Sequence, residues 1–112
     1  MYKQGDILLV PIPFTDLTSS KRRPVLVLSN SSYNNSSEDI IVIAITSNIR
    51  GGKREILFDD SDMIEGYLPK TSCIRSDKVY TLSKSIVVKR YGALSQSKTL
   101  DVKERLIDIV TE

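Results

Sequence analysis

The stretch that most limits the possible folds is Ile40–Thr46, in which six of the seven residues are Ile, Val or Ala and none is charged. β-Branched side chains lose freedom in helices and pack well on pleated sheets. A strand with one wet face alternates apolar and polar residues, whereas an unbroken apolar run predicts a strand buried on both faces. We therefore expect Ile40–Thr46 to be the central strand of a sheet.

Two further apolar runs precede this strand, and a polar connector rich in turn formers joins them. The first run is Ile7–Ile12 and the second begins at Arg23 and continues to Ser29. Runs of this length and Val/Ile/Leu content, separated by such a connector, predict a hairpin of two strands. Pro24 restricts Arg23 mainly to extended backbone conformations, so the guanidinium group is held at the mouth of the sheet by a backbone with little freedom.

The rest of the chain predicts short strands and one helix. In chain order we first expect a surface loop at Asn30–Glu38, and later a hairpin that turns at Arg50–Lys53 into a strand at Arg54–Phe58. An irregular segment with at most one helical turn should follow at Asp59–Pro69, and then a strand at Ser72–Leu82. A further strand at Lys84–Lys89 should break at Tyr91–Leu94, before a C-terminal helix. The helix is predicted because Val102, Leu106 and Ile109 recur at helical spacing, with Ser95, Ser97 or Thr99 as its cap. The fold class is mainly β (α+β), a small curled antiparallel sheet with a C-terminal helix.

The amino-acid composition excludes several kinds of catalytic and metal site. The chain has 112 residues, which is room for one domain, and it contains no histidine and a single cysteine, Cys73. These counts exclude a Ser-His-Asp triad, an intrachain disulfide and most zinc sites, so we expect no metal and no other cofactor. Cys73 lies in an apolar run and is expected to be buried. No N-terminal apolar segment is long enough for a signal peptide or a membrane span, which predicts a cytoplasmic protein without a membrane partner.

Polar residues at the ends of the predicted strands form a candidate site. They are Thr15, Asp16 and Lys21 to Arg23 at the first connector, Thr46 and Ser47, Arg50, and Arg75 with Asp77. The net charge of +2 does not establish a nucleic-acid partner, but a curled sheet would bring these residues together. Arginine, hydroxyl and aspartate groups without histidine suit RNA cleavage in which the 2′-OH of the substrate attacks the adjacent phosphorus. Arginine would stabilise the phosphate charge, the hydroxyls would donate to it, and aspartate would take the proton.

The same residues also have ordinary structural explanations. Arg75 and Asp77 lie on one face of a strand, two residues apart, and can form an exposed ion pair worth ~0–1 kcal/mol. Arg23 can protect a strand edge from aggregation, and Thr46 and Ser47 are common turn residues. Periodicity does not decide between these explanations and a functional site.

Four segments carry motifs in a consistent order: Gly5–Asp16, Lys21–Ser29 with its Arg23-Pro24 pair, Ile43–Ser47, and Ser72–Leu82 with its Arg75-x-Asp77 pair. Together they closely resemble the PemK/MazF family of toxin endoribonucleases from type II toxin–antitoxin systems. The resemblance covers nearly the whole chain and implies one toxin domain over residues 1–112 with an SH3-like barrel fold. It also implies a homodimer and metal-independent, sequence-selective cleavage of single-stranded mRNA that leaves a 2′,3′-cyclic phosphate and a 5′-OH. The implied protein partner is a cognate antitoxin, through which the complex would bind DNA.

Carried over residue by residue, the resemblance places Arg23 and Thr46 in the catalytic pocket. It identifies Arg75 and Asp77 with the pair to which some members assign acid and base, whereas members that lack the pair rely on Arg and Thr alone. The expected RNA-binding residues are Thr15, Lys21, Arg22, Ser47, Arg50 and Lys78. The first loop lacks the histidine that some members carry there, and Lys21 or Arg22 is the candidate substitute.

Two other functions remain open for the same fold. A related toxin family poisons gyrase by protein contact without cutting RNA, because a fold does not fix a function. Such a binding protein has no use for Arg23, Thr46, Arg75 and Asp77 gathered in one groove. A degenerate relative that binds RNA without cleaving it is separated from a nuclease only by an activity assay.

Overall fold

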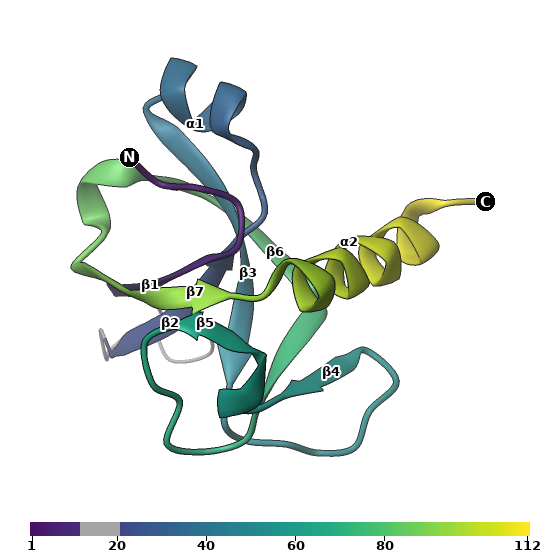
Figure 1. Ribbon diagram of the computed structural model, residues 1–112. Helices are drawn as coiled ribbons and strands as arrows, with labels where there is room; N and C mark the ends of the chain where they lie inside the picture. Colours follow the sequence, from purple (N-terminus) through teal and green to yellow (C-terminus); the bar gives the residue numbers. More distant parts are fainter. Residues whose placement is uncertain (12–20) are drawn as a thin grey trace.

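The computed structural model describes residues 1–11 and 21–112, and these residues form one curled antiparallel sheet in a half-barrel with a C-terminal helix (Figure 1). The strands are β1 (Asp6–Pro11), β2 (Arg22–Val27), β3 (Asp39–Thr46), β4 (Glu55–Phe58), β5 (Met63–Glu65), β6 (Ser72–Ser83) and β7 (Lys89–Leu94). The helices are α1 (Ser31–Ser36) and α2 (Gln96–Val110), with short 3-10 turns η1 (Asp60–Asp62) and η2 (Lys84–Ile86). In space, the described strands follow the order β4-β6-β3-β2-β1-β7-β5.

Apolar side chains cover both faces of the interior strands. On one face, Ile45 of β3 packs in a cluster that includes Val102 of α2, so the helix covers this side of the sheet. On the other face, Val42 of β3 packs in a second cluster with residues of β1 and β2. Both clusters form because β3 is apolar at consecutive positions, and side chains of a strand point alternately to the two faces.

The main predictions for the fold are confirmed. β1 and β2 form the expected antiparallel hairpin, with Val10 opposite Arg23. α2 begins after Ser95, whose side chain accepts a hydrogen bond from the backbone N–H of Lys98. β3 is an interior strand as predicted, although β2 rather than β3 is the middle one of the seven described strands. The predicted end of the first strand at Ile12 lies outside the described residues.

Two predicted connections are wrong. β3 and β4 do not form a hairpin, because β6 lies between them in the sheet. The segment Asn30–Glu38 is not all loop, since it contains α1, which Asn30 caps by accepting the backbone N–H of Tyr33. Asn34 anchors this short helix: it is fully buried, and its side-chain amide donates to the backbone carbonyl of Ser29 at 2.9 Å. A buried hydrogen-bonding side chain thus replaces the apolar periodicity that normally reveals a helix.

Two strand predictions are also wrong. The segment Asp59–Pro69, expected to hold no strand, contains β5, which pairs with β7. β7 occupies Lys89–Leu94, where a break was expected, and the preceding residues form η2 instead of a strand. Gly92 explains the difference, because a Cβ atom there would overlap the backbone carbonyl oxygen of Glu65 in β5. The glycine marks a close approach of two strands rather than the end of one.

Candidate functional site

A cavity of about 370 Å³ opens where the beginning of β2, the end of β3 and the middle of β6 meet. We call it the cationic cavity, and the residues that line it are Arg23, Ala44, Ile45, Thr46, Asn48, Arg50, Arg75, Lys78 and Tyr80. Of the lining residues within 1–11 and 21–112, four side chains are positively charged and none is negative. Concave surfaces lined by charge of one sign concentrate ligands of the opposite sign. The cavity is therefore suited to an anion.

β6 directs Arg75 and Lys78 into the cavity through an irregularity in its pairing with β3. Only one residue of β3 opposes residues 75–78, which lie outside the regular ladder. In a regular strand, residues three apart point to opposite faces, so these two side chains could not share a cavity. Ser76 holds the irregular segment in place, because its N–H and its hydroxyl both donate to the backbone carbonyl of Arg54, at 2.9 and 2.8 Å. Irregularities of this kind commonly re-aim side chains at functional sites.

Arg75 and Asp77 form the ion pair that their spacing predicts. Nε of Arg75 lies 3.8 Å from Oδ1 of Asp77, and the two side chains are 32% and 36% exposed. Within the described part of the chain, this Nε is buried and makes no hydrogen bond. A buried N–H without a hydrogen bond costs free energy, and such groups in folded proteins call for an explanation such as a functional role. Asp77 itself does not line the cavity.

Thr46 of β3 and Arg23 of β2 also line the cationic cavity. Oγ1 of Thr46 accepts the backbone N–H of Asn48 at 3.0 Å, which leaves its O–H as a donor to a ligand. Arg23 is half-buried near the beginning of β2. Because β2 lies between β1 and β3, protection of a sheet edge does not explain this arginine.

The structure brings most of the predicted site residues together. Those that line the cationic cavity are Arg23, Thr46, Arg50, Arg75 and Lys78. The side chains of Lys21 and Arg22 are exposed and line neither this cavity nor the pocket described next. Thr15 lies outside the described residues. Sequence reasoning missed Asn48 and Tyr80, although Asn48 directly follows the Thr46-Ser47 pair and could have been found there.

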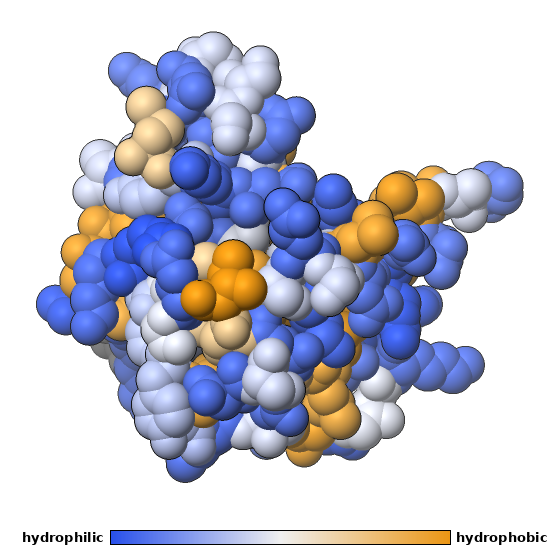
Figure 2. All heavy atoms as spheres, viewed as in Figure 1, coloured by the Kyte–Doolittle hydropathy of each residue, from blue (hydrophilic) through white to orange (hydrophobic). Residues whose placement is uncertain are grey.

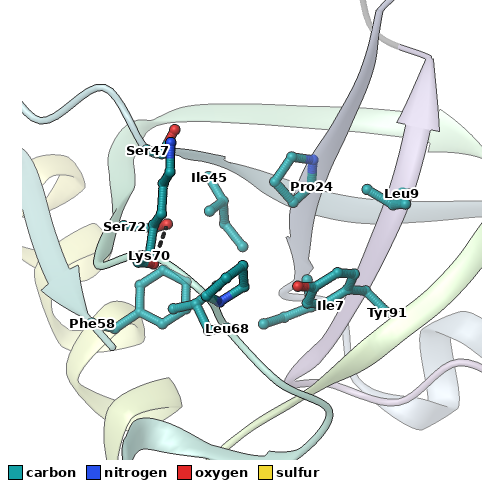
Figure 3. Close-up of a pocket in the computed structure, with 11 residues that line it drawn as sticks. Ile7, Leu9, Pro24, Ile45, Ser47, Phe58, Leu68, Lys70, Ser72 and Tyr91 are labelled. Carbon is teal, nitrogen blue, oxygen red and sulfur yellow. Dashed lines mark hydrogen bonds between the residues drawn. The ribbon is translucent and has the colours of Figure 1, made fainter. Parts of the chain in front are cut away.

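Ser47 lies in a separate apolar pocket of about 270 Å³ on the other face of β2 and β3. Pro24 and Ser47 line this pocket, whereas the residues before them, Arg23 and Thr46, line the cationic cavity. Successive residues of an extended chain point to opposite faces, which explains why each pair is divided. Figure 3 shows Pro24 across the apolar pocket from Phe58. The expected role of Ser47 beside Thr46 therefore does not fit its position.

Cys73 is not a reactive thiol. It is fully buried, as predicted, and this burial is the main reason why the pKa of its thiol lies above the ordinary value. Among residues 1–11 and 21–112, no group of three or more His, Cys, Asp or Glu side chains is arranged to hold a metal ion. In the same part of the chain, no helix has the length and apolar character needed to cross a membrane.

Comparison with known proteins gives a consistent result. The model of a family described as the PemK-like, MazF-like toxin of type II toxin–antitoxin systems matches residues 3–110. The endoribonuclease MazF of Staphylococcus epidermidis is 29% identical over 107 residues, which cover 95% of this chain and 88% of that protein. The Mycobacterium tuberculosis toxin MazF-mt6 has a similar structure, with a TM-score of 0.73 and 22% identity over 92% of this chain and 93% of that one. A MazE–MazF structure from Deinococcus radiodurans is also similar, with a TM-score of 0.78 and 19% identity, and the match covers 97% of this chain and 95% of that one.

Proposed function

The chain belongs to the PemK-like, MazF-like toxins of type II toxin–antitoxin systems, and from this premise we propose that it is a metal-independent, sequence-selective endoribonuclease for single-stranded RNA. The observation that carries the proposal is the cationic cavity, in which Arg23, Thr46 and Arg75 lie together. A curated relative that is called an endoribonuclease, with which nearly the whole chain aligns, supports it. The substrate is mRNA, which places the protein in the cytoplasm.

In the proposed reaction the substrate supplies the nucleophile. The 2′-OH of one nucleotide attacks the adjacent phosphorus, and the bond from phosphorus to the 5′-oxygen of the next nucleotide breaks. Asp77 does not line the cavity but lies beside it, 3.8 Å from Nε of Arg75, and its carboxylate accepts the proton of a 2′-OH that extends beyond the cavity, while water protonates the departing 5′-oxygen. The products are a 2′,3′-cyclic phosphate and a 5′-OH. The protein's work is to orient the RNA and to stabilise the charge that develops on the phosphate.

The lining residues fit these tasks. The planar guanidinium groups of Arg23 and Arg75 can each donate two hydrogen bonds to phosphate oxygens. The O–H of Thr46, free to donate because its oxygen already accepts from Asn48, bonds a non-bridging oxygen. Arg50 and other basic residues of the cavity bind neighbouring phosphates. Arg75 also links the phosphate to Asp77, which lies 3.8 Å from its Nε.

The proposed protein partners are a cognate antitoxin and a second copy of the chain. A mycobacterial endoribonuclease with the same fold and 19% identity has been solved with its cognate antitoxin. For the second copy, α2 offers apolar area: Leu100, Ile107 and Val110 are 50%, 56% and 73% exposed. Figure 2 shows hydrophobic atoms on the projecting end of this helix. Exposed apolar area of this kind is stabilised when a partner covers it.

The test is to incubate the purified protein with a long mixed-sequence RNA in excess EDTA and to map the new 5′-ends. We expect cuts at one short shared sequence, fragments whose 5′-ends carry a hydroxyl, and 3′-ends that carry a cyclic phosphate. Arg23→Ala protein purified in the same way controls for contaminating ribonucleases. Fragments with 5′-phosphate ends would reject the mechanism, and a folded protein that leaves the RNA intact would reject the activity.

A further inference from the structure

Glu55, the first residue of β4, closes the loop that carries Arg50. Its carboxylate accepts the backbone N–H groups of three consecutive residues, from Arg50 at 3.0 Å, from Gly51 at 2.7 Å and from Gly52 at 3.2 Å. Gly51 has a φ of +78°, a left-handed conformation that suits glycine. Converging backbone N–H groups form an anion-binding nest, and here the protein fills it with its own carboxylate. The hydrogen bonds, that from Arg50 foremost, hold the pKa of Glu55 below its ordinary value.

The closed loop lies beside the cationic cavity. The side chain of Arg50 lines the cavity, and Glu55 is paired across strands β4 and β6 with Arg75, another lining residue. Directly paired residues lie on the same face of a sheet, so Glu55 belongs to the face that holds the cavity. In the described part of the chain, Arg75 forms its ion pair with Asp77 and not with Glu55. The carboxylate of Glu55 instead accepts hydrogen bonds from the backbone N–H groups of the loop.

The far end of the loop is anchored independently. Ser76 donates two hydrogen bonds to the backbone carbonyl of Arg54, the residue before Glu55. In the loop's first half, the Glu55 carboxylate holds the backbone N–H groups of Arg50 and Gly51, while the backbone N–H of Glu55 donates to the carbonyl of Gly52 at 3.2 Å. We propose that Glu55 is a positioning residue for RNA binding, whose carboxylate fixes Arg50–Gly52 so that the Arg50 guanidinium meets an RNA phosphate. This inference rests on the proposed function, because it names RNA as the ligand of the cavity.

The direction of the effect distinguishes positioning from simple electrostatics. A carboxylate beside an RNA site repels phosphate, so on electrostatic grounds its removal should tighten RNA binding. If Glu55 instead positions the loop, removal of its carboxylate should weaken RNA binding. Oε1 of Glu55 accepts from all three N–H groups, and Oε2 accepts a second bond from Arg50 at 3.0 Å. In Glu55→Gln one of these oxygens becomes an amide nitrogen, which donates instead of accepting, and the other loses its negative charge, so the hydrogen bonds to the loop weaken. The loop then loses its fixed geometry and the contact from Arg50 weakens.

The experiment compares Glu55→Gln, Arg50→Ala and the double variant with the wild type. Glu38→Gln is the matched control, since it removes the same charge from an exposed residue just before β3, at the end of that strand far from Thr46. Binding is measured with a random-sequence pool of single-stranded 2′-O-methyl oligonucleotides, which lack the attacking hydroxyl. Glu55→Gln should weaken binding about fivefold, which corresponds to the lower end, about 1 kcal/mol, of the cost of one lost arginine contact. The cleavage assay should show a raised KM with kcat less affected.

The double variant decides whether Glu55 acts through Arg50. We expect it to bind no more weakly than Arg50→Ala alone, because two changes that remove the same contact are not additive. Hydrogen exchange at the Gly51 and Gly52 amides should be faster in Glu55→Gln than in the wild type. Binding by Glu55→Gln that equals or exceeds that of the wild type would overturn the inference, and so would a fully additive loss in the double variant. Binding and exchange require no cleavage, so failure of the proposed nuclease activity would be seen separately.

Discussion

Replacement of Arg23 by Ala should remove most RNA cleavage while the fold is kept. The half-buried side chain lines the cationic cavity, whereas the backbone of residue 23 pairs with Val10 of β1 whatever its side chain. A preorganised donor aimed at developing charge contributes about 2.7–4 kcal/mol to the transition state, which corresponds to a loss of about 10²–10³-fold in cleavage rate. The free energy of unfolding should change by about 1 kcal/mol or less, because the side chain is not in the apolar core.

Two companion variants separate charge from geometry. Arg23→Lys keeps the positive charge but cannot make the two-pronged contact of a guanidinium group, so it should recover little of the lost activity. Arg22→Ala removes the same charge from the exposed neighbour of Arg23, outside the cavity lining, and should reduce cleavage by less than about tenfold.

The assay is initial-rate cleavage of one mixed-sequence RNA by the four proteins at matched soluble concentration, with circular dichroism to confirm the fold. Near-wild-type cleavage by a folded Arg23→Ala protein would remove Arg23 from the site. Full activity of Arg23→Lys would show that any positive charge suffices at this position and would refute the geometric role of the guanidinium group.

Three other outcomes are expected. Cleavage should continue in excess EDTA, because the proposed chemistry uses only side chains and the 2′-OH, and a loss that Mg²⁺ or Mn²⁺ restores would contradict this. Asn34→Ala should lower the free energy of unfolding by about 2–3 kcal/mol in urea, since it leaves the buried carbonyl of Ser29 and the partly buried carbonyl of Tyr2 without the amide that donates to them at 2.9 and 3.2 Å. Exposed Asn35→Ala is its control, and equal effects of the two would refute the anchoring role. Light scattering at micromolar concentration should give twice the 12.6 kDa of one chain, and a monomer mass would contradict the proposed dimer.

The elements that sequence predicted correctly are those whose signal is local. β3 is an uninterrupted β-branched run, the β1–β2 hairpin joins neighbouring segments, and α2 has apolar residues at helical spacing after a serine cap. The position of β4 could not be predicted in this way, because its partner β6 is distant in sequence and displaces the adjacent β3. Likewise, α1 depends on the buried contacts of Asn34 and has no apolar periodicity.

The same distinction between local and long-range signals applies to the candidate site. Arg23, Thr46 and Arg75 were identified from motifs, and all three line one cavity. Two features that shape the cavity leave no periodic signal: the irregular segment of β6 that Ser76 holds, and the loop that Glu55 closes. Both depend on hydrogen bonds to backbone groups, whose positions are set by the folded chain rather than by residue type.

The most direct test of RNA cleavage by 2′-OH attack uses a short RNA that contains one mapped cleavage site. A single 2′-deoxy nucleotide is placed immediately 5′ of the cut bond in one substrate and one position further away in another. The proposed mechanism predicts that the first substrate is bound but not cut, because the nucleophile is missing, whereas the second is cut at close to the unmodified rate. Cleavage of the first substrate at the normal position would contradict 2′-OH attack and would require a nucleophile from the protein or from water.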